Sequence, residues 1–334
     1  AIATLLRSRR PLARLVVTRA PPGARRPPYA TLSRLSPMPT TNINNNEHKQ
    51  TLFSHFRANS CIIDHTESAP CADNSITSTP KDESRPMNEE IAGFVIDLDG
   101  TVYRGKQAIA GAIPAVAAIK AAGKRTVFLS NRGNMSRAAV RNRLREMGMD
   151  AAEEDEILLS STVTARYVKK EYPDARVWTL GDVGLREELE AAGVVLADKP
   201  EQADWLIITL HETLTYAELN TAFRAVRHGA GIIATNADKT FPGEDGESID
   251  VGGMIAAITA TTGKEVDIVI GKPSRLMADA ALDVLGLPPE RCVVVGDSLE
   301  SDVRLGKQAG MRTALVLTGS LNRQDAEASE WRPD

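Results

Sequence analysis

Short apolar runs alternate with longer amphipathic segments from Gly93 to the end of the chain. The short runs are rich in β-branched residues, which favours strands, and they lie at 94–97, 125–130, 157–160, 268–271, 292–297 and 313–317. The segments between them have apolar residues at helical spacing, which predicts helices over 114–122, 136–147, 162–171, 274–285 and 300–309. Strands that alternate with helices indicate an α/β fold with a parallel sheet, as in Rossmann-like domains.

A second series of strands and helices interrupts the first, between the third and fourth of those strands. Its predicted strands are 176–180, 205–210 and 231–235, and its predicted helices are 185–192, 216–228 and 254–262. An insert of about 90 residues is long enough to form its own hydrophobic core. We therefore predict a core domain made of residues 87–172 and 265–334, with an inserted α/β cap domain over 173–264.

The first 86 residues show neither pattern. They hold 12 basic residues, 6 acidic residues and 10 of the 18 prolines, and a run of asparagines lies near Asn44. Such a composition favours a disordered segment. The alternative is an organellar transit peptide, because the start is rich in arginine and poor in acids. Met87, six residues before the first strand, resembles an ordinary protein start, and we expect a cytoplasmic protein from it.

Charge and composition exclude several classes of protein. Residues 87–334 hold 28 basic and 38 acidic residues, which argues against a nucleic-acid-binding enzyme. No run of 18 apolar residues occurs, so a transmembrane helix is not expected. The three cysteines, Cys61, Cys71 and Cys292, are too few for a disulfide framework and lack metal-ligand spacing.

Polar residues that carry chemistry follow four of the predicted core strands. Asp97 and Asp99 end the first strand, Ser130 and Asn131 the second, Lys272 the fourth and Asp297 the fifth. Ligands of open α/β sheets bind beyond the carboxyl ends of the strands, so these side chains are expected at one sheet edge. Clustered carboxylates require a neutralising cation, and their hard oxygen atoms suit Mg²⁺. A carboxylate that attacks a metal-polarised phosphate, helped by a second carboxylate as acid and base, is the chemistry that fits.

These four motifs resemble those of the haloacid dehalogenase superfamily of phosphohydrolases over residues 90–320. An insert between the second and third motifs resembles the NagD-like group, which has a large α/β cap. Longer strings, such as Phe128 to Asn134, Leu210 to Tyr216 and Ala234 to Asn236, resemble the arabinose-operon sugar phosphatases. The tail before Met87 has no counterpart in the family, and a final strand and helix are expected beyond Asp334.

The resemblance implies a role for each motif residue. Asp97 is expected to be the nucleophile and Asp99 the general acid and base, while Ser130 and Lys272 hold the phosphoryl group. Mg²⁺ is expected on the Asp97 carboxylate, the Asp99 backbone carbonyl and the Asp297 carboxylate. Asp302 is expected to have a supporting role.

Substrate selection is expected from the cap, since the core motifs bind only phosphate and metal. Asn236, Asp238 and Phe241 follow the strand predicted at 231–235, where strand ends supply ligand contacts. The sequence gives Phe241 no core to join, so a surface position and a substrate contact are both open. Asn131 and Arg132 complete the predicted substrate-binding set.

The sequence therefore predicts a Mg²⁺-dependent phosphatase of sugar phosphates and similar small phosphomonoesters, without nucleic-acid or membrane partners. A sugar phosphomutase shares the four motifs and is the alternative within the superfamily. A nucleic-acid-binding protein that uses the arginine-rich arm is the alternative from another class. A homo-oligomer formed through the cap also remains open.

Overall fold

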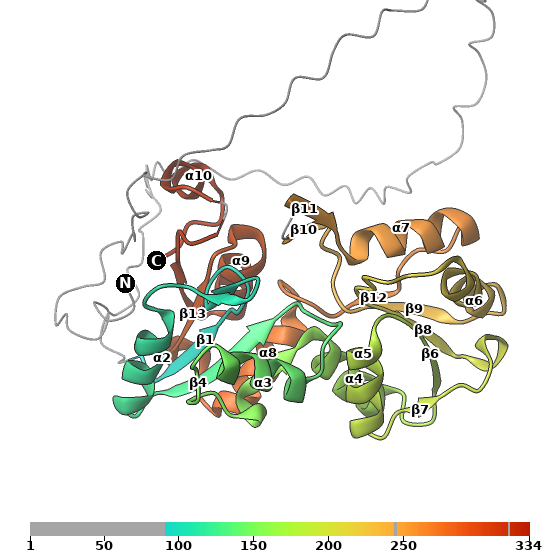
Figure 1. The fold of residues 1–334 in the computed structure, drawn as a ribbon, viewed down its shortest axis with the longest axis horizontal. Coiled ribbons are helices and arrows are strands. Elements are labelled where there is room, and N and C mark those ends of the chain that lie inside the picture. The colour runs from blue at the N-terminus through green and yellow to red at the C-terminus, as the bar shows by residue number, and fades with distance from the viewer. Residues whose placement is uncertain (1–90, 244–245, 320) are drawn as a thin grey trace, which may run out of the picture. The chain divides into compact units, whose positions relative to one another are not determined.

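The computed structural model describes residues 91–243, 246–319 and 321–334. The tail predicted over 1–86 lies outside these residues. The predicted fold class is confirmed, because the chain forms two five-stranded parallel sheets with helices packed against them (Figure 1). We call residues 91–172 and 270–334 the core region and residues 173–269 the cap region. No helix in the described ranges is long and apolar enough to cross a membrane.

The core sheet has the strand order β14-β13-β1-β4-β5. Its strands are β1 (Gly93–Ile96), β4 (Arg125–Ser130), β5 (Ile157–Leu159), β13 (Cys292–Gly296) and β14 (Arg312–Leu315). Their apolar residues are continuous because both faces of a parallel sheet are covered. In β1, Phe94 and Ile96 pack into one hydrophobic cluster and Val95 packs into another on the opposite face.

Among the described helices of the core region, all but the last begin and end within four residues of a predicted helix, and the last was not predicted. They are α2 (Ala112–Ala121), α3 (Arg137–Glu146), α4 (Ser160–Glu171), α8 (Arg275–Leu285), α9 (Arg304–Ala309) and α10 (Arg323–Ala328). The segment predicted as one helix over 300–309 contains a π-helical turn, η4 (Leu299–Val303), before α9. Gly286 and Gly310 end α8 and α9 in the left-handed conformation, which a glycine adopts without strain.

The cap sheet has the order β12-β9-β8-β6-β7. Its strands are β6 (Arg176–Leu180), β7 (Val195–Leu196), β8 (Trp205–Ile208), β9 (Gly231–Ala234) and β12 (Ile268–Val269). Its helices are α5 (Val183–Ala191), α6 (Tyr216–Arg227) and α7 (Val251–Thr262). Residues of α6, α7, β8 and β9 share one hydrophobic cluster, so one face of this sheet has a core of its own.

The sheet assignment of the strand predicted at 268–271 was wrong. Residues 268–269 form β12, which pairs in parallel with β9 of the cap sheet and not with the core strands. A Cβ at Gly271, two residues after β12, would lie 2.5 Å from the Thr235 carbonyl oxygen, so this position requires a glycine. The cap sheet therefore extends past the boundary predicted after Lys264.

Two short antiparallel pairs were not predicted: β2 (Tyr103–Arg104) with β3 (Gln107–Ala108), and β10 (Thr240–Gly243) with β11 (Gly246–Ile249). The second pair lies just after Asp238.

Candidate active site

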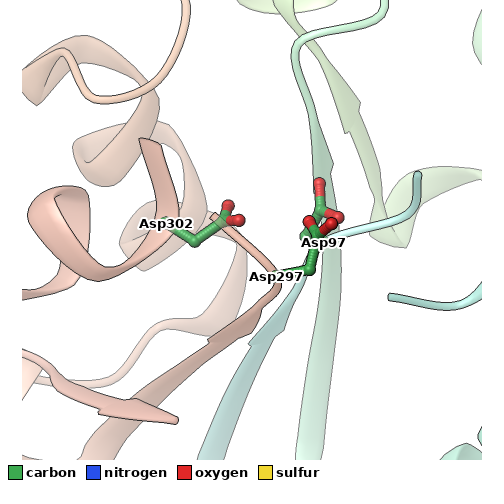
Figure 2. Close-up of side chains that lie close together, drawn as sticks. All are labelled: Asp97, Asp297 and Asp302. Carbon is green, nitrogen blue, oxygen red and sulfur yellow. The ribbon is translucent and has the colours of Figure 1, made fainter. Parts of the chain in front are cut away.

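The parallel core sheet brings the predicted motifs to one edge. β1 lies between β13 and β4, and Ile96 is in register with Val295 on one side and Phe128 on the other. Asp97, Asp297 and Ser130 therefore come to the same edge of the sheet. Figure 2 shows the Asp97 and Asp297 carboxylates close together, with Asp302 facing them from the segment after β13.

A buried ion-pair network holds the predicted nucleophile. The Lys272 ammonium donates to Asp97 Oδ1 over 2.6 Å and to Asp302 Oδ1 over 2.7 Å, and all three side chains are buried. Burial raises the pKa of Asp97 above its usual range, the Lys272 charge opposes this, and the charges of Asp302 and Asp297 add to it. Burial alone lowers the pKa of Lys272, but Asp302 and Asp97 outweigh it and raise that pKa overall. The lysine is therefore a fixed cation at the tip of the sheet.

Three carboxylates form a group that can hold a metal ion. Asp97, Asp297 and Asp302 each offer one oxygen, and these oxygens lie within 4.8 Å of one another. Asp97 Oδ2 is buried and accepts no hydrogen bond from the described residues. Burial, and then the charge of Asp302, raises the pKa of Asp297 to about 7, with Lys272 opposing. Because hard oxygen ligands and uncompensated negative charge favour a divalent cation, the donor set fits one.

The predicted ligand set overlaps this group in part. Asp97 and Asp297 belong both to the predicted ligand set and to the observed group of carboxylates. Asp302, for which a supporting role is predicted, is the third member of the observed group. Asp302 also accepts a hydrogen bond from the Ser298 backbone N–H over 3.1 Å, so both of its oxygens have protein partners. Those contacts are consistent with a supporting role.

Asp99 makes a separate set of contacts. Arg132 donates to Asp99 Oδ1 over 3.0 Å and to Oδ2 over 3.3 Å, and the Tyr103 hydroxyl donates to Oδ2 over 3.0 Å. Arg132, predicted to bind substrate, thus holds the predicted general acid. Tyr103 is fully buried, and burial followed by the Asp99 charge raises its pKa, so its hydroxyl stays a donor.

Sequence reasoning missed Tyr103. Its signal in the sequence is only an aromatic residue four positions after Asp99 in a short turn, and a hydrophobic core position explains an aromatic there equally well.

The loop after β4 contacts the cap region. Ser130 Oγ accepts a hydrogen bond from the Arg132 backbone N–H over 3.1 Å, and Asn131 Nδ2 donates to Asp238 Oδ2 over 2.9 Å. Asn236 is buried and donates to the Asn131 carbonyl oxygen over 3.0 Å. The structure thus brings Asn131 together with Asn236 and Asp238, and both asparagine side chains bond to protein groups; substrate binding by these residues stays a prediction.

Asp250 is a second cap carboxylate that was not predicted. It caps α7 by accepting a hydrogen bond from the Val251 backbone N–H over 2.7 Å, and its own N–H bonds to the Lys239 carbonyl oxygen. Burial raises its pKa to about 6, the hydrogen bond from Val251 opposes this, and the charge of Asp238 adds to it.

The expectation that Phe241 has no core to join was wrong. Phe241 lies in β10, is half-buried and packs against the hydrophobic cluster of the cap region. The pairing of β10 with β11 turns the segment back over that cluster, a long-range arrangement that the polar sequence around Phe241 conceals. A contact between this ring and a substrate remains a prediction.

Comparisons with known proteins agree with this geometry. A family model described as haloacid dehalogenase-like hydrolase matches residues 94–195, and a second, described as HAD-hydrolase-like, matches residues 269–334. The sugar-phosphatase AraL of Bacillus subtilis is 52% identical to the chain over 243 residues, which cover 73% of this chain and 88% of that protein.

Two solved structures are similar as well. The p-nitrophenyl phosphatase from Archaeoglobus fulgidus is 37% identical, has a TM-score of 0.69, and is matched over 73% of this chain and 95% of its own. A protein described as a putative NagD protein is 36% identical with a TM-score of 0.67, over 73% of this chain and 95% of its own. These matches confirm the family that the motifs predict: the chain belongs to the haloacid dehalogenase-like hydrolases.

Proposed function

We propose that the chain is a Mg²⁺-dependent phosphatase that hydrolyses phosphorylated sugars and similar small phosphomonoesters. The names of the similar proteins, a sugar phosphatase and a p-nitrophenyl phosphatase, support phosphomonoester hydrolysis. The observation that carries the proposal is the state of Asp97. One of its oxygens is held by Lys272, and the other is buried without a donor among the described residues, beside two further carboxylates.

The chemistry assigned to these residues has two steps. In the first, an Asp97 carboxylate oxygen attacks phosphorus and forms an aspartyl phosphate, while the bond to the leaving oxygen breaks and Asp99 protonates that oxygen. In the second, Asp99 takes a proton from water, the water oxygen attacks phosphorus, and Asp97 is released with inorganic phosphate. In the structure Arg132 and Tyr103 donate hydrogen bonds to both Asp99 oxygens, so in this scheme Asp99 gives up one of these contacts when it carries the proton.

Positive charge and hydrogen-bond donors hold the phosphoryl group in this scheme. Lys272 is a buried cation beside Asp97, and Ser130 lies at the adjacent strand end. Such preorganised groups stabilise the charge that develops on phosphoryl oxygens in the transition state. A Mg²⁺ ion on Asp97, Asp297 and the Asp99 carbonyl would polarise the phosphate and neutralise the crowded carboxylates.

A substrate screen tests the proposal. Purified protein is freed of metal with a chelator and assayed for phosphate release from a panel of sugar phosphates and p-nitrophenyl phosphate, with and without added Mg²⁺. We expect release from several sugar phosphates, only with the metal. A phosphomutase would instead move the phosphoryl group to another hydroxyl of the sugar, so an isomeric sugar phosphate formed without free phosphate would contradict the proposal.

A further inference from the structure

The side-chain amide of Asn131 connects the core region with the cap region. Its Oδ1 accepts a hydrogen bond from the Lys272 backbone N–H over 2.7 Å. Its Nδ2 donates to the Lys272 carbonyl oxygen over 3.2 Å and to Asp238 Oδ2 over 2.9 Å. The amide therefore binds both backbone groups of the residue whose ammonium holds Asp97, together with a carboxylate of the cap.

The hydrogen-bonding capacity of the Asn131 side chain argues against a direct contact between its amide group and phosphate. An asparagine side chain has two N–H donors, and both are directed to protein acceptors here. Phosphate oxygens accept hydrogen bonds, so a phosphate would need a donor that this amide has already committed. For the side-chain amide, substrate binding therefore fits the geometry less well than a role in holding other residues.

The backbone of Asn131 is tied to its surroundings as well. Its carbonyl oxygen accepts hydrogen bonds from Ser160 Oγ over 2.7 Å, at the start of α4, and from Asn236 Nδ2 over 3.0 Å, after β9. A Cβ at Gly271 would lie 2.8 Å from Asn131 Oδ1. This close packing fixes the position of the amide.

We propose that Asn131 is a positioning residue that keeps cap residues 236–238 in register with Lys272. This inference rests on the proposed phosphatase function, in which the cap contacts the leaving group and Lys272 holds the phosphoryl group. A contact between the leaving group and the cap then acts on Lys272 through Asp238 and the Asn131 amide. Substrates that use the cap should depend on this connection, and an aryl phosphate, whose leaving group departs easily, should depend on it much less.

A double-mutant cycle tests the connection. The variants are Asn131→Ala, Asp238→Ala and the double variant, and kcat/KM is measured with glucose 6-phosphate and with p-nitrophenyl phosphate. With the sugar phosphate we expect at least tenfold coupling, so that the double variant is little worse than the more damaged single variant. With p-nitrophenyl phosphate, the loss of kcat/KM in the double variant should equal the product of the two single losses to within about threefold. Asp238→Asn keeps an oxygen acceptor for Asn131 Nδ2 and should restore part of the loss.

Asn134 supplies a matched control. It lies in the same loop, is buried, and also directs Nδ2 to a cap carboxylate, Asp182 Oδ2, at 3.5 Å. A cycle of Asn134→Ala with Asp238→Ala should show less than threefold coupling for both substrates. If the Asn131 cycle shows equal coupling for both substrates, Asn131 has only a structural role. If the single losses in kcat/KM multiply for both substrates, Asn131 acts independently of Asp238. Either result overturns the proposal.

Hydrogen exchange gives a readout that is independent of turnover. Asn131→Ala should speed amide exchange both at Lys272 and at residues 236–238, whereas Asn134→Ala should leave Lys272 at the parent rate. Exchange at the parent rate in the Asn131→Ala protein overturns the proposal whichever substrate is used. If the parent enzyme hydrolyses p-nitrophenyl phosphate but no sugar phosphate, the proposed substrate class fails, and this exchange measurement still decides the role of Asn131.

Discussion

Gly100 offers a sharp test of the cluster of three carboxylates at the sheet edge, because it lies against one of them, the Asp297 carboxylate. Its φ is +86°, and an ideal Cβ there would lie 2.2 Å from Asp297 Oδ2 and 2.6 Å from Cγ. In Gly100→Ala the carboxylate must therefore move by about 1 Å to reach van der Waals separation. A misplacement of about 1 Å in a catalytic constellation can cost about 100-fold in rate, which corresponds to about 2.7 kcal/mol.

Backbone strain has to be separated from that displacement. A residue with a side chain costs about 1–2 kcal/mol in the left-handed region, and Gly100→Ala suffers this penalty as well. Gly111 has the same φ of +86°, and an ideal Cβ there meets nothing within 4 Å. Gly111→Ala therefore reproduces the strain without touching the site.

The assay compares the two variants with the parent by thermal unfolding and by kcat/KM against Mg²⁺ concentration. Both variants should unfold a few degrees lower, since about 1 kcal/mol lowers Tm by about 2–4 °C in a chain of this size. Gly100→Ala alone should lose about 100-fold in kcat/KM and require more Mg²⁺ for half-maximal activity. If its activity and metal response match those of Gly111→Ala to within threefold, Asp297 is not a metal ligand in the way we infer.

Three further predictions concern the nucleophile, the metal and a cap carboxylate. Asp97→Asn should abolish phosphate release while the fold is retained, because an amide cannot attack phosphorus; turnover within about tenfold of the parent, measured with p-nitrophenyl phosphate, would contradict a covalent mechanism. Chelation should silence the parent enzyme and added Mg²⁺ should restore it, whereas activity that survives thorough chelation would exclude a metal-dependent reaction. For Asp250, a folded-state pKa of about 6 against a usual 3.8 means that the folded protein binds this proton more tightly than the unfolded chain, so the contribution of Asp250 to the free energy of unfolding falls as pH rises from about 4 to about 6. Asp250→Asn keeps the helix cap. In urea unfolding, the free energy of unfolding of the variant minus that of the parent should increase between about pH 4 and about pH 6, by at most about 3 kcal/mol. A difference that does not change with pH would contradict the buried environment of Asp250.

The sequence was sufficient for the parts of the structure that local pattern determines. The core strands and most helices follow from apolar spacing, and parallel pairing then places Asp97, Ser130 and Asp297 at one edge. Contacts between side chains distant in sequence were not predictable in the same way. That Lys272 bonds to two carboxylates, and that Arg132 bonds to Asp99, depends on packing that periodicity does not encode.

The two short strands of the cap region, β10 and β11, were not predicted for a related reason. β10 and β11 have four residues each, among glycine, proline and charged residues, so neither alternation nor helical spacing is visible. Their antiparallel pairing nevertheless turns Phe241 onto the cap cluster.

The wrong assignment of β12 bears directly on function. Val269 pairs with Ala234 in the cap sheet, and Lys272, three residues later, reaches Asp97 in the core. Had the strand belonged to the core sheet, Lys272 would have been held by the core alone. Its backbone instead follows the last cap strand after two residues and is bonded at both its N–H and its carbonyl group by Asn131. The segment that carries Lys272, which we propose binds the phosphoryl group, is thus also a covalent connection to the region that we expect to contact the leaving group.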